Sequence, residues 1–414
     1  MLKEKIHNAI VQNRTQLENW FMGKNHDLIY PIYASFDIRD SGYKIAPVDA
    51  NVFPAGFNNI CHQDQDAGVE LAQGYLDTHY PEAQIIGLVT EEHTQNPYYW
   101  ENVFSLYNLI SKTGREVLIA FPRDEEEPSF NVRSINGHDL KIHSALNRGG
   151  CVFVDGKKVD LILSNNDFSH AYESWAEGLK TPINPPHALG WHKRKKESFF
   201  KIYNQLAGEF AEVLGIQPWS IQVATAPFRD FDVSNIEIKR SLSEKVDEMV
   251  TNLKQQYQQF GISENPFIYV KNNSGTYGMG VTKVISGQDI LEWNNRTRTK
   301  MKASKGGRGI SELIIQEGIP SVIKTDEITA EPVIYMLGCQ LLGGFLRAHN
   351  KKGESENLNS PGAVYKRLCV NDLQVSVQGH PMENVYGWLA KLGILAIAME
   401  AKEIGVKYVG YCDK

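Results

Sequence analysis

Lys271 and the glycine-rich segment after it have the residue types and spacing of a phosphate-binding loop. Residues 271–280 are Lys-Asn-Asn-Ser-Gly-Thr-Tyr-Gly-Met-Gly. Glycine has no Cβ, so such a loop can bring backbone N–H groups against an anion, and Lys271 would add an ammonium. The alternative is a plain glycine-rich hairpin with an exposed lysine. The predicted phosphate cradle comprises Lys271, Ser274, Gly275, Thr276, Tyr277, Gly278, Met279 and Gly280.

Strand-forming residues flank this loop at 267–270 and 281–285, which predicts a β-hairpin. The segment differs from a P-loop because no Gly-Lys-Ser/Thr follows the glycines, and it differs from a dinucleotide fingerprint because no helix follows at once. Residues 311–319 are a further predicted strand, and Arg347 lies on a later one.

The order of these segments resembles the ATP-grasp ligases, and the glutathione synthetase-like members in particular. The resemblance implies that the lysine and the hairpin cover the ATP phosphates. It places the adenine at a hinge formed by Gln316, Glu317 and Ile319, and it makes Arg347 face the phosphates and an acyl phosphate. Lys271 and Arg347 are therefore the predicted catalytic residues.

The segment 44–59 is dense in Pro, Gly, Asn and Asp, which predicts a long structured loop. Loops of this kind are plausible substrate binders. The alternative is a turn cluster whose side chains bond only their own backbone. Arg39 lies just before this stretch, and its guanidinium could bind a carboxylate in a bidentate manner. The carboxylate and amide oxygens of the stretch could bind an ammonium group. The candidate substrate residues here are Arg39, Asp49, Asn51, Asn58 and Asn59.

A basic run at 192–196 is the second candidate substrate segment, with His192 and Arg194 as its proposed binding residues. It could clamp a polyphosphate or a carboxylate, or it could be the solvated start of a helix. His187 and His192 do not indicate a metal site, because no third ligand lies at a recognised spacing.

The elements that must position these residues predict an α/β protein. Strands near 84–94, 116–121 and 159–167 alternate with helices at 66–78 and 98–113, a pattern typical of a parallel sheet. Ligands bind beyond the carboxyl ends of such strands, where Thr90-Glu-Glu-His-Thr lies. Further helices are expected at 2–21, 197–214, 241–260 (opened by a Ser241/Glu244 capping box) and 383–404. The predicted regions are an N-terminal α/β substrate domain (1–215), a helical connection (216–265) and a C-terminal ATP-grasp-like domain (266–414).

Composition excludes several classes of protein. The 414 residues, 42% hydrophobic and 22% charged, suit a globular protein of two or three domains. The net charge of −6 argues against nucleic-acid or anionic-membrane partners. No signal peptide or membrane span is expected. Five scattered cysteines without a Cys-x-x-Cys pattern predict reduced thiols and a cytoplasmic location. Oligomeric state stays open.

Four longer motifs, at 48–59, 187–196, 270–280 and 357–362, resemble the bacterial glutamate–cysteine ligases with an ATP-grasp-like fold. The resemblance runs from about residue 30 to the end. It implies ATP- and Mg²⁺-dependent joining of the glutamate γ-carboxyl group to the amine of cysteine through an acyl phosphate, the first step of glutathione synthesis. The alternatives are another amino-acid ligase and a nucleotide-binding protein without catalysis. In this hypothesis Arg39 holds a glutamate carboxylate, with Arg194 as the competing candidate.

The metal ligands are where the sequence departs from this pattern. ATP-grasp enzymes usually carry an Asp, and later a Glu-x-Asn, on their last strands, but this chain stops one residue after Asp413. Either the ligands come from elsewhere, or a strand is missing. Oxygen ligands suit Mg²⁺, which makes Glu331, Asn357, Asn359 and Asp413 the candidates.

Overall fold

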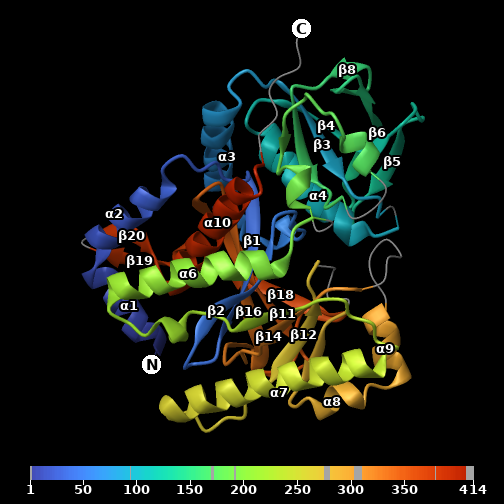
Figure 1. Cartoon of the computed structure of the whole chain (residues 1–414). Helices are drawn as coiled ribbons and strands as arrows, with labels where there is room; N and C mark the ends of the chain where they lie inside the picture. The colour runs from blue at the N-terminus through green and yellow to red at the C-terminus, as the bar shows by residue number, and fades with distance from the viewer. Residues whose placement is uncertain are drawn as a thin grey trace.

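The computed structural model describes residues 2–93, 95–168, 172–190, 193–274, 280–302, 310–377 and 379–406. Within these residues the strands form three main sheets and one two-stranded ribbon (Figure 1). Each sheet packs against helices, so the expected α/β class is confirmed. No described helix is long and apolar enough to cross a membrane.

The central sheet is antiparallel, in the order β18-β17-β16-β1-β2, with β15 also paired to β16. The hairpin of β1 and β2 lies beside β16, with Asp37 opposite Val333. This corrects the loop expected at 44–59, because residues 45–51 are a strand and only the residues after it form turns. The strands are β1 (Tyr33–Asp40), β2 (Ile45–Asn51), β15 (Lys324–Thr325), β16 (Ile328–Leu337), β17 (Gln340–His349) and β18 (Ala363–Leu368).

The central sheet also crosses the predicted domain boundaries. β1 and β2 come from the region predicted to bind substrate, whereas β16, β17 and β18 come from the predicted nucleotide-binding region. A boundary near 215–265 therefore does not separate two sheets in space. Local patterning can predict these strands, but it cannot say which distant strand each will pair with.

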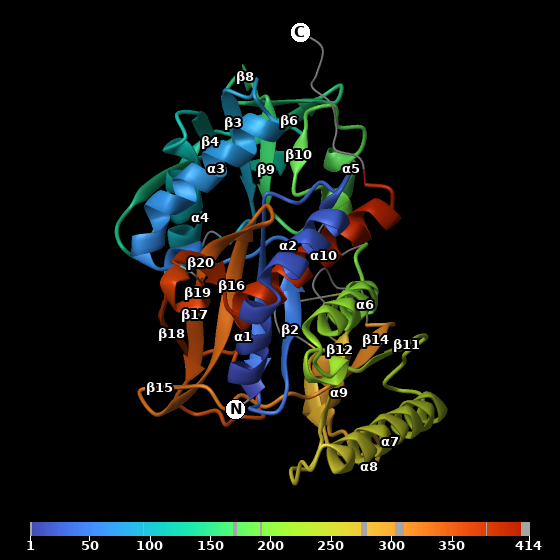
Figure 2. The ribbon, with the colours of Figure 1, turned by 90° about the vertical axis from the view of Figure 1, so that its left-hand side faces the viewer.

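One face of the central sheet packs on helices. Ala34, Phe36 and Ile38 of β1 are fully buried in a core shared with α6 and α10, as expected for every second residue of a strand. Figure 2 shows these helices together on one side of the sheet. The helices on this side are α1 (Leu2–Gln12), α2 (Arg14–Asn25), α6 (Lys196–Leu214) and α10 (Val385–Glu403). The helix expected at 2–21 is thus two helices.

The second sheet contains the predicted parallel strands. Its order is β10-β9-β3-β4-β6-β7-β8, and the pairs β10–β9, β9–β3, β3–β4 and β4–β6 are parallel, which confirms the alternation read from the sequence. The elements are α3 (Gln65–His79), β3 (Ile85–Thr90), α4 (Pro97–Ser111), β4 (Glu116–Arg123), β5 (Phe130–Arg133), β6 (Asp139–Arg148), β7 (Cys151–Val154), β8 (Lys157–Lys158), β9 (Leu161–Asn165), α5 (Glu173–Ala176) and β10 (Ile183–Asn184).

The third sheet has the order β11-β14-β12-β13, and α7 packs on it. The predicted hairpin is confirmed, since Ile268 pairs with Val284. α7 begins earlier than expected, because the side chain of Asn235 caps it in place of Ser241. The elements are β11 (Thr225–Phe228), α7 (Ile236–Gln259), β12 (Ile268–Asn272), β13 (Thr282–Val284), α8 (Gln288–Leu291), α9 (Asn295–Lys302) and β14 (Leu313–Glu317); a ribbon of β19 (Gln374–Val377) and β20 (His380–Glu383) precedes α10.

Three of the described cysteines are disulfide-bonded. Cys61 and Cys369 form a disulfide with each other, and Cys151 is also disulfide-bonded, so the expectation of reduced thiols is wrong for these three in this structure. The cause is tertiary: Cys61 and Cys369 are 308 residues apart, and the turn after β2 packs beside β18. Asp64 lies close to both sulfurs, but sulfurs joined to each other are not thiolate ligands, so the trio is not a metal site.

Candidate active site

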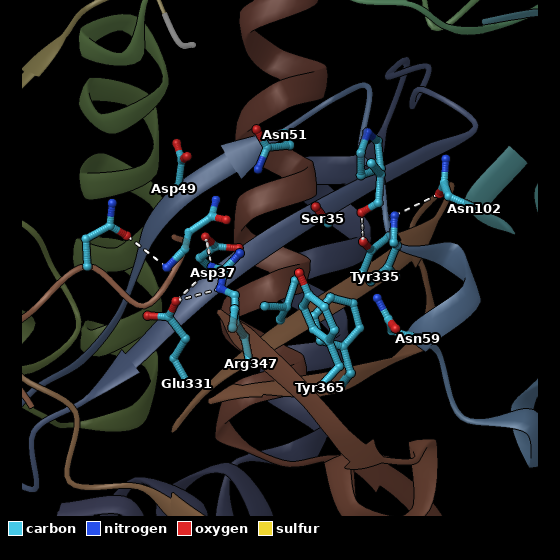
Figure 3. Close-up of a pocket in the computed structure, with 18 of the residues that line it drawn as sticks. Ser35, Asp37, Asp49, Asn51, Asn59, Asn102, Glu331, Tyr335, Arg347 and Tyr365 are labelled. Carbon is cyan, nitrogen blue, oxygen red and sulfur yellow. Dashed lines mark hydrogen bonds and ion pairs between the residues drawn. The ribbon is translucent and has the colours of Figure 1, made fainter. Parts of the chain in front are cut away.

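A cavity of about 1100 Å³ lies between the three sheets. One end is lined by β1, β2, β12, β16, β17 and the start of α6. The other end is lined by the turn after β2, the loop after β3, the start of α4 and the residue pair after β9. In Figure 3, Asp49, Glu331 and Arg347 lie on one side of Tyr365, and Asn59 and Asn102 lie on the other.

Strand alternation makes one face of the central sheet the floor of this cavity. Ser35, Asp37 and Arg39 line the cavity, whereas the residues between them are apolar and face the helices. Side chains also alternate between the two faces of the sheet along β16 and β17, and this places Glu331 and Arg347 on the cavity floor. The sequence shows this alternation in Ala-Ser-Phe-Asp-Ile-Arg, a signal that could have identified Asp37 as a site residue.

Four charged side chains on this floor form one buried network. One carboxylate oxygen of Glu331, Oε2, accepts a hydrogen bond from Arg39 Nε. The other oxygen, Oε1, accepts from two nitrogens of Arg347, Nε at 2.9 Å and Nη2 at 2.8 Å. Arg347 Nη2 also bonds Asp37. Burial works to raise the pKa of Glu331, but the two arginines outweigh it and hold that pKa below its ordinary value. Glu331 is thus an anchor for the arginines, which argues against its predicted role as a metal ligand.

The two arginines differ in what remains for a ligand. Arg39 also donates to the carbonyl oxygens of Glu354, at 2.9 Å, and Glu356, at 2.8 Å, so all three of its guanidinium nitrogens have protein partners. Arg347 Nη1 has no hydrogen-bond partner among the residues that the structure describes. The geometry therefore favours Arg347 over Arg39 as the arginine that meets an anionic ligand.

Asp37, Asp49 and Asn51 bring three oxygen donors to the hairpin of β1 and β2. Asp37 is directly opposite Asp49, and Asn51 follows two residues later, on the same face of the strand. Burial raises the pKa of Asp37 to about 6; Arg347 opposes this shift, and the neighbouring Glu331 and Asp49 add to it. The resemblance to ATP-grasp enzymes predicted an acid, and later an acid-x-Asn pattern, on the last strands of the chain. Here the same residue types, Asp37 and then Asp49 and Asn51, lie near the beginning of the chain, on strands beside β16.

Two lysines approach the same oxygens. Lys271, at the end of β12, donates to the carbonyl oxygen of Val48 at 3.1 Å, and burial lowers the pKa of Lys271 to about 8. Lys196, the first residue of α6, bonds Asp49. Burial works to raise the pKa of Asp49, but Lys196 and Lys271 together hold it low. The basic run therefore reaches the cavity through Lys196, which was not among the predicted site residues.

The other residues predicted in the basic run do not line the cavity as described. Arg194 is only 3% exposed; it donates to Glu400 at 2.8 Å and to the carbonyl oxygen of Ala50 at 3.0 Å. This makes Arg194 a buried link between α10 and β2, and it removes the competing candidate for a substrate carboxylate. His192 lies outside the described residues.

The predicted phosphate cradle is described only at its edges. Gly275, Thr276, Tyr277, Gly278 and Met279 lie outside the described residues. Ser274 accepts from Lys195 Nζ at 2.7 Å, and Gly280 has φ +65°, with Ile310 only 2.8 Å from where a Cβ would stand. Gly280 is therefore required by the backbone itself, whether or not a phosphate binds.

The predicted adenine hinge is only partly suited to a ligand. Ile319 lines the cavity. Gln316 Nε2 donates to the carbonyl oxygen of Val48, while its Oε1 is buried without a partner among the described residues. Glu317 is different, because both of its oxygens accept from Lys44 at 2.7 Å. Glu317 therefore holds the β1–β2 turn against β14 and is not available to adenine, which corrects its predicted role.

Of the remaining metal candidates, Asn357 and Asn359 line the cavity, and Asp413 lies outside the described residues. Both asparagines lie on the loop from β17 to β18, which also contributes the carbonyl oxygens of Glu354 and Glu356 that accept from Arg39.

The far end of the cavity is built by amides. Asn58 and Asn59 line it, as predicted. Their turn is held by Asn102 of α4, whose Oδ1 accepts from Gly56 N at 2.7 Å and Phe57 N at 3.0 Å. Sequence reasoning missed Asn102, because nothing in a helical pattern shows that a buried asparagine caps a distant turn. The sequence placed the segment that contains His93 at a ligand-binding edge, but it missed further lining residues at this end: Asn96, Tyr98, Tyr99, Glu101, Asn136 and Asp167.

Comparisons with known proteins agree on one family. Residues 7–401 match the family model described as GshA, glutamate-cysteine ligase. A crystal structure of a "Putative gamma-glutamylcysteine synthetase" from Methylobacillus flagellatus KT is similar, with TM-score 0.87, 31% identity and 96% of each chain covered. A glutathione synthetase-like effector from Globodera pallida, with TM-score 0.39, 10% identity and 89% and 84% of the two chains covered, is too distant to carry an argument. A search of curated proteins found no match.

Proposed function

The chain belongs to the glutamate–cysteine ligase family, and from this membership we propose that its cavity binds ATP, glutamate and cysteine and joins the two amino acids through a γ-glutamyl phosphate. The observation that carries the proposal is the meeting of Asp37, Asp49 and Asn51 with Arg347 and Lys271 at one end of the cavity. These are groups that neutralise a transferring phosphoryl group, and no nucleophilic side chain is needed for this chemistry.

In this proposal the cationic side chains position the phosphates and the reacting carboxylate. Lys271 and Lys196 stand on either side of Asp49 and would face the ATP phosphates. Arg347 is fixed by Glu331 and Asp37, so its remaining N–H groups are preorganised to bind the γ-carboxylate of glutamate as it accepts the phosphoryl group. Arg39 acts indirectly, because it holds Glu331 in place.

A divalent metal ion, typical of this family, fits the hairpin of β1 and β2. Asp37, Asp49 and Asn51 supply hard oxygen donors, and they stand together on neighbouring strands of one hairpin. Mg²⁺ bound there would neutralise charge on the ATP phosphates. We infer that the strands which end an ATP-grasp domain are here placed at the start of the chain, as a circular permutation.

The nucleotide base would lie at the end of β14. Ile319, which lines the cavity just after β14, would offer the base an apolar contact. Asn58 and Asn59, at the other end, would bind the amino acids. The partners are thus small molecules, and a cytoplasmic location stays a prediction.

Measuring ADP formation with each amino acid tests the proposal against its alternatives. The expected result is ADP formation that requires a divalent metal ion and glutamate and is fastest with cysteine, with gamma-glutamylcysteine as the product. Equal rates with other acceptor amines would favour a different amino-acid ligase. ATP binding without turnover under all conditions would favour a binding protein and would refute the proposal.

A further inference from the structure

His93 stands at the carboxyl end of β3 and lines the cavity, in the segment Thr90-Glu-Glu-His that the sequence placed at a ligand-binding edge. Nothing in the reaction proposed above uses it. Phosphoryl transfer to glutamate requires no base, but the second half of an amide ligation does. The α-amino group of a free amino acid is mainly protonated at neutral pH, and an ammonium has no lone pair with which to attack.

The ring of His93 is held by a buried carboxylate. Its Nε2 is 2.5 Å from Oε2 of Glu91, a side chain only 8% exposed, while the His93 side chain is 42% exposed. The ring also packs edge-on against Tyr99, with centroids 4.9 Å apart, and the Tyr99 hydroxyl accepts from the backbone N–H of Glu91. An ionised carboxylate only accepts hydrogen bonds, so Nε2 carries a proton, and in the neutral ring Nδ1 is then the nitrogen with the lone pair.

The charges around His93 suit an ammonium. The lysines and arginines among the described lining residues, Arg39, Lys196, Lys271 and Arg347, all belong to the opposite end of the cavity. At the His93 end the charged lining residues are Glu101 and Asp167. Asp167 follows β9, the parallel neighbour of β3, so both strands deliver these groups to one edge.

We propose that His93 is the catalytic base that deprotonates the α-ammonium of the acceptor amino acid, and that Glu91 is the residue that positions it. This rests on the function proposed above. One proton moves from the ammonium to Nδ1 of His93. The freed amine then forms a bond to the carbonyl carbon of the γ-glutamyl phosphate, and the bond between that carbon and the phosphate oxygen breaks. The phosphate leaves with that electron pair, and it takes up the second proton that the nitrogen loses on becoming an amide.

The test compares two acceptors in one variant, His93→Gln, whose side chain can still donate to Glu91 but cannot act as a base. With cysteine, kcat should fall about 100-fold or more, the usual contribution of a general base. Hydroxylamine is already uncharged at neutral pH, so it needs no base. Formation of the γ-glutamyl hydroxamate should therefore stay within about threefold of wild type.

Two further variants keep the test decisive. Glu91→Gln should lower kcat with cysteine by a smaller factor and also spare hydroxylamine. His26→Gln, a matched histidine that pairs with Asp27 far from the cavity, should leave both rates unchanged. If His93→Gln lowered the rates with cysteine and with hydroxylamine equally, or lowered neither rate, His93 would not be the catalytic base. Failure of the wild type to form the hydroxamate would instead contradict the acyl phosphate itself.

Discussion

The two ends of the cavity are built from different interactions. At the end floored by the central sheet, three carboxylates and four cationic side chains are buried together and paired with one another. At the end formed by the parallel sheet, asparagines, tyrosines and one histidine–carboxylate pair line the wall. The first end is suited to neutralising charge during phosphoryl transfer, and the second to binding the amino acids, with Glu101 and Asp167 beside their ammonium groups.

This contrast predicts unequal responses to substitution. Removing one partner of a buried ion pair leaves an uncompensated charge and costs about 3–5 kcal/mol. Losing a neutral hydrogen bond costs about 0.5–1.5 kcal/mol, or somewhat more if a buried group is left unsatisfied. Changes at the charged end should therefore have the larger effects, on turnover or on the need for the metal ion, and changes at the amide end should mainly weaken binding of the amino acids.

Arg347→Lys should have the largest effect. The lysine keeps a positive charge but cannot bond Asp37 and Glu331 while also facing the reacting carboxylate. Removal of one preorganised donor lowers kcat by about 10²–10³, and we expect the upper end of that range. Steady-state kinetics of ADP formation would measure it.

The control for this variant is Arg115→Lys. Arg115 is also a buried arginine paired with an aspartate, Asp77, but it does not line the cavity. It should lose stability in a thermal melt without losing kcat. If both variants lost activity in proportion to their loss of stability, Arg347 would be a structural residue and the charged end would have no special role in turnover.

Asp49→Asn should have an intermediate effect, confined to the metal ion. Removing one negative oxygen donor should raise the Mg²⁺ concentration for half-maximal activity by about 100-fold, the upper part of the range seen when metal-site partners are lost. Asn357→Ala and Asn359→Ala are the matched controls, since they remove the competing candidates. A shift in the controls but not in Asp49→Asn would move the metal site to the loop after β17.

Much of the local fold could be predicted from the sequence. The parallel strands follow from the alternation of apolar runs with helical patterns, the end of α6 follows from Gly215, and the hairpin of β12 and β13 follows from its runs of β-branched and aromatic residues. Lys271, Asn58 and Asn59 were found because their motifs are local. What the sequence could not supply was the pairing of β1 with β16, because strand partners are chosen by tertiary packing, not by neighbouring residues.

That single pairing explains most of the site errors. Without it, Asp37 is one acid in a buried strand, Arg39 looks available to a substrate, and Glu331 looks available to a metal ion. With it, Arg39 and Arg347 share Glu331, and Asp37 and Asp49 stand opposite each other on the strands that floor the cavity. Arg194 was misjudged for the same reason, since its partner Glu400 comes from the last described helix.

Asn102→Ala should have the smallest effect and should separate the two ends most cleanly. The variant removes the acceptor for Gly56 N and Phe57 N, so the turn that carries Asn58 and Asn59 loses its anchor. A loss of about 1.4 kcal/mol would raise the KM of an amino acid about tenfold. The KM for ATP should not change, because Lys196 and Lys271, which would face the ATP phosphates, line the opposite end of the cavity. Asn147→Ala is the matched control: Asn147 anchors another turn, through Gly150 N at 2.8 Å and the Trp175 carbonyl oxygen at 2.7 Å, away from the cavity. It should leave both KM values unchanged. A rise in the KM for ATP in Asn102→Ala, equal to the rise for the amino acids, would show that the two ends do not act separately.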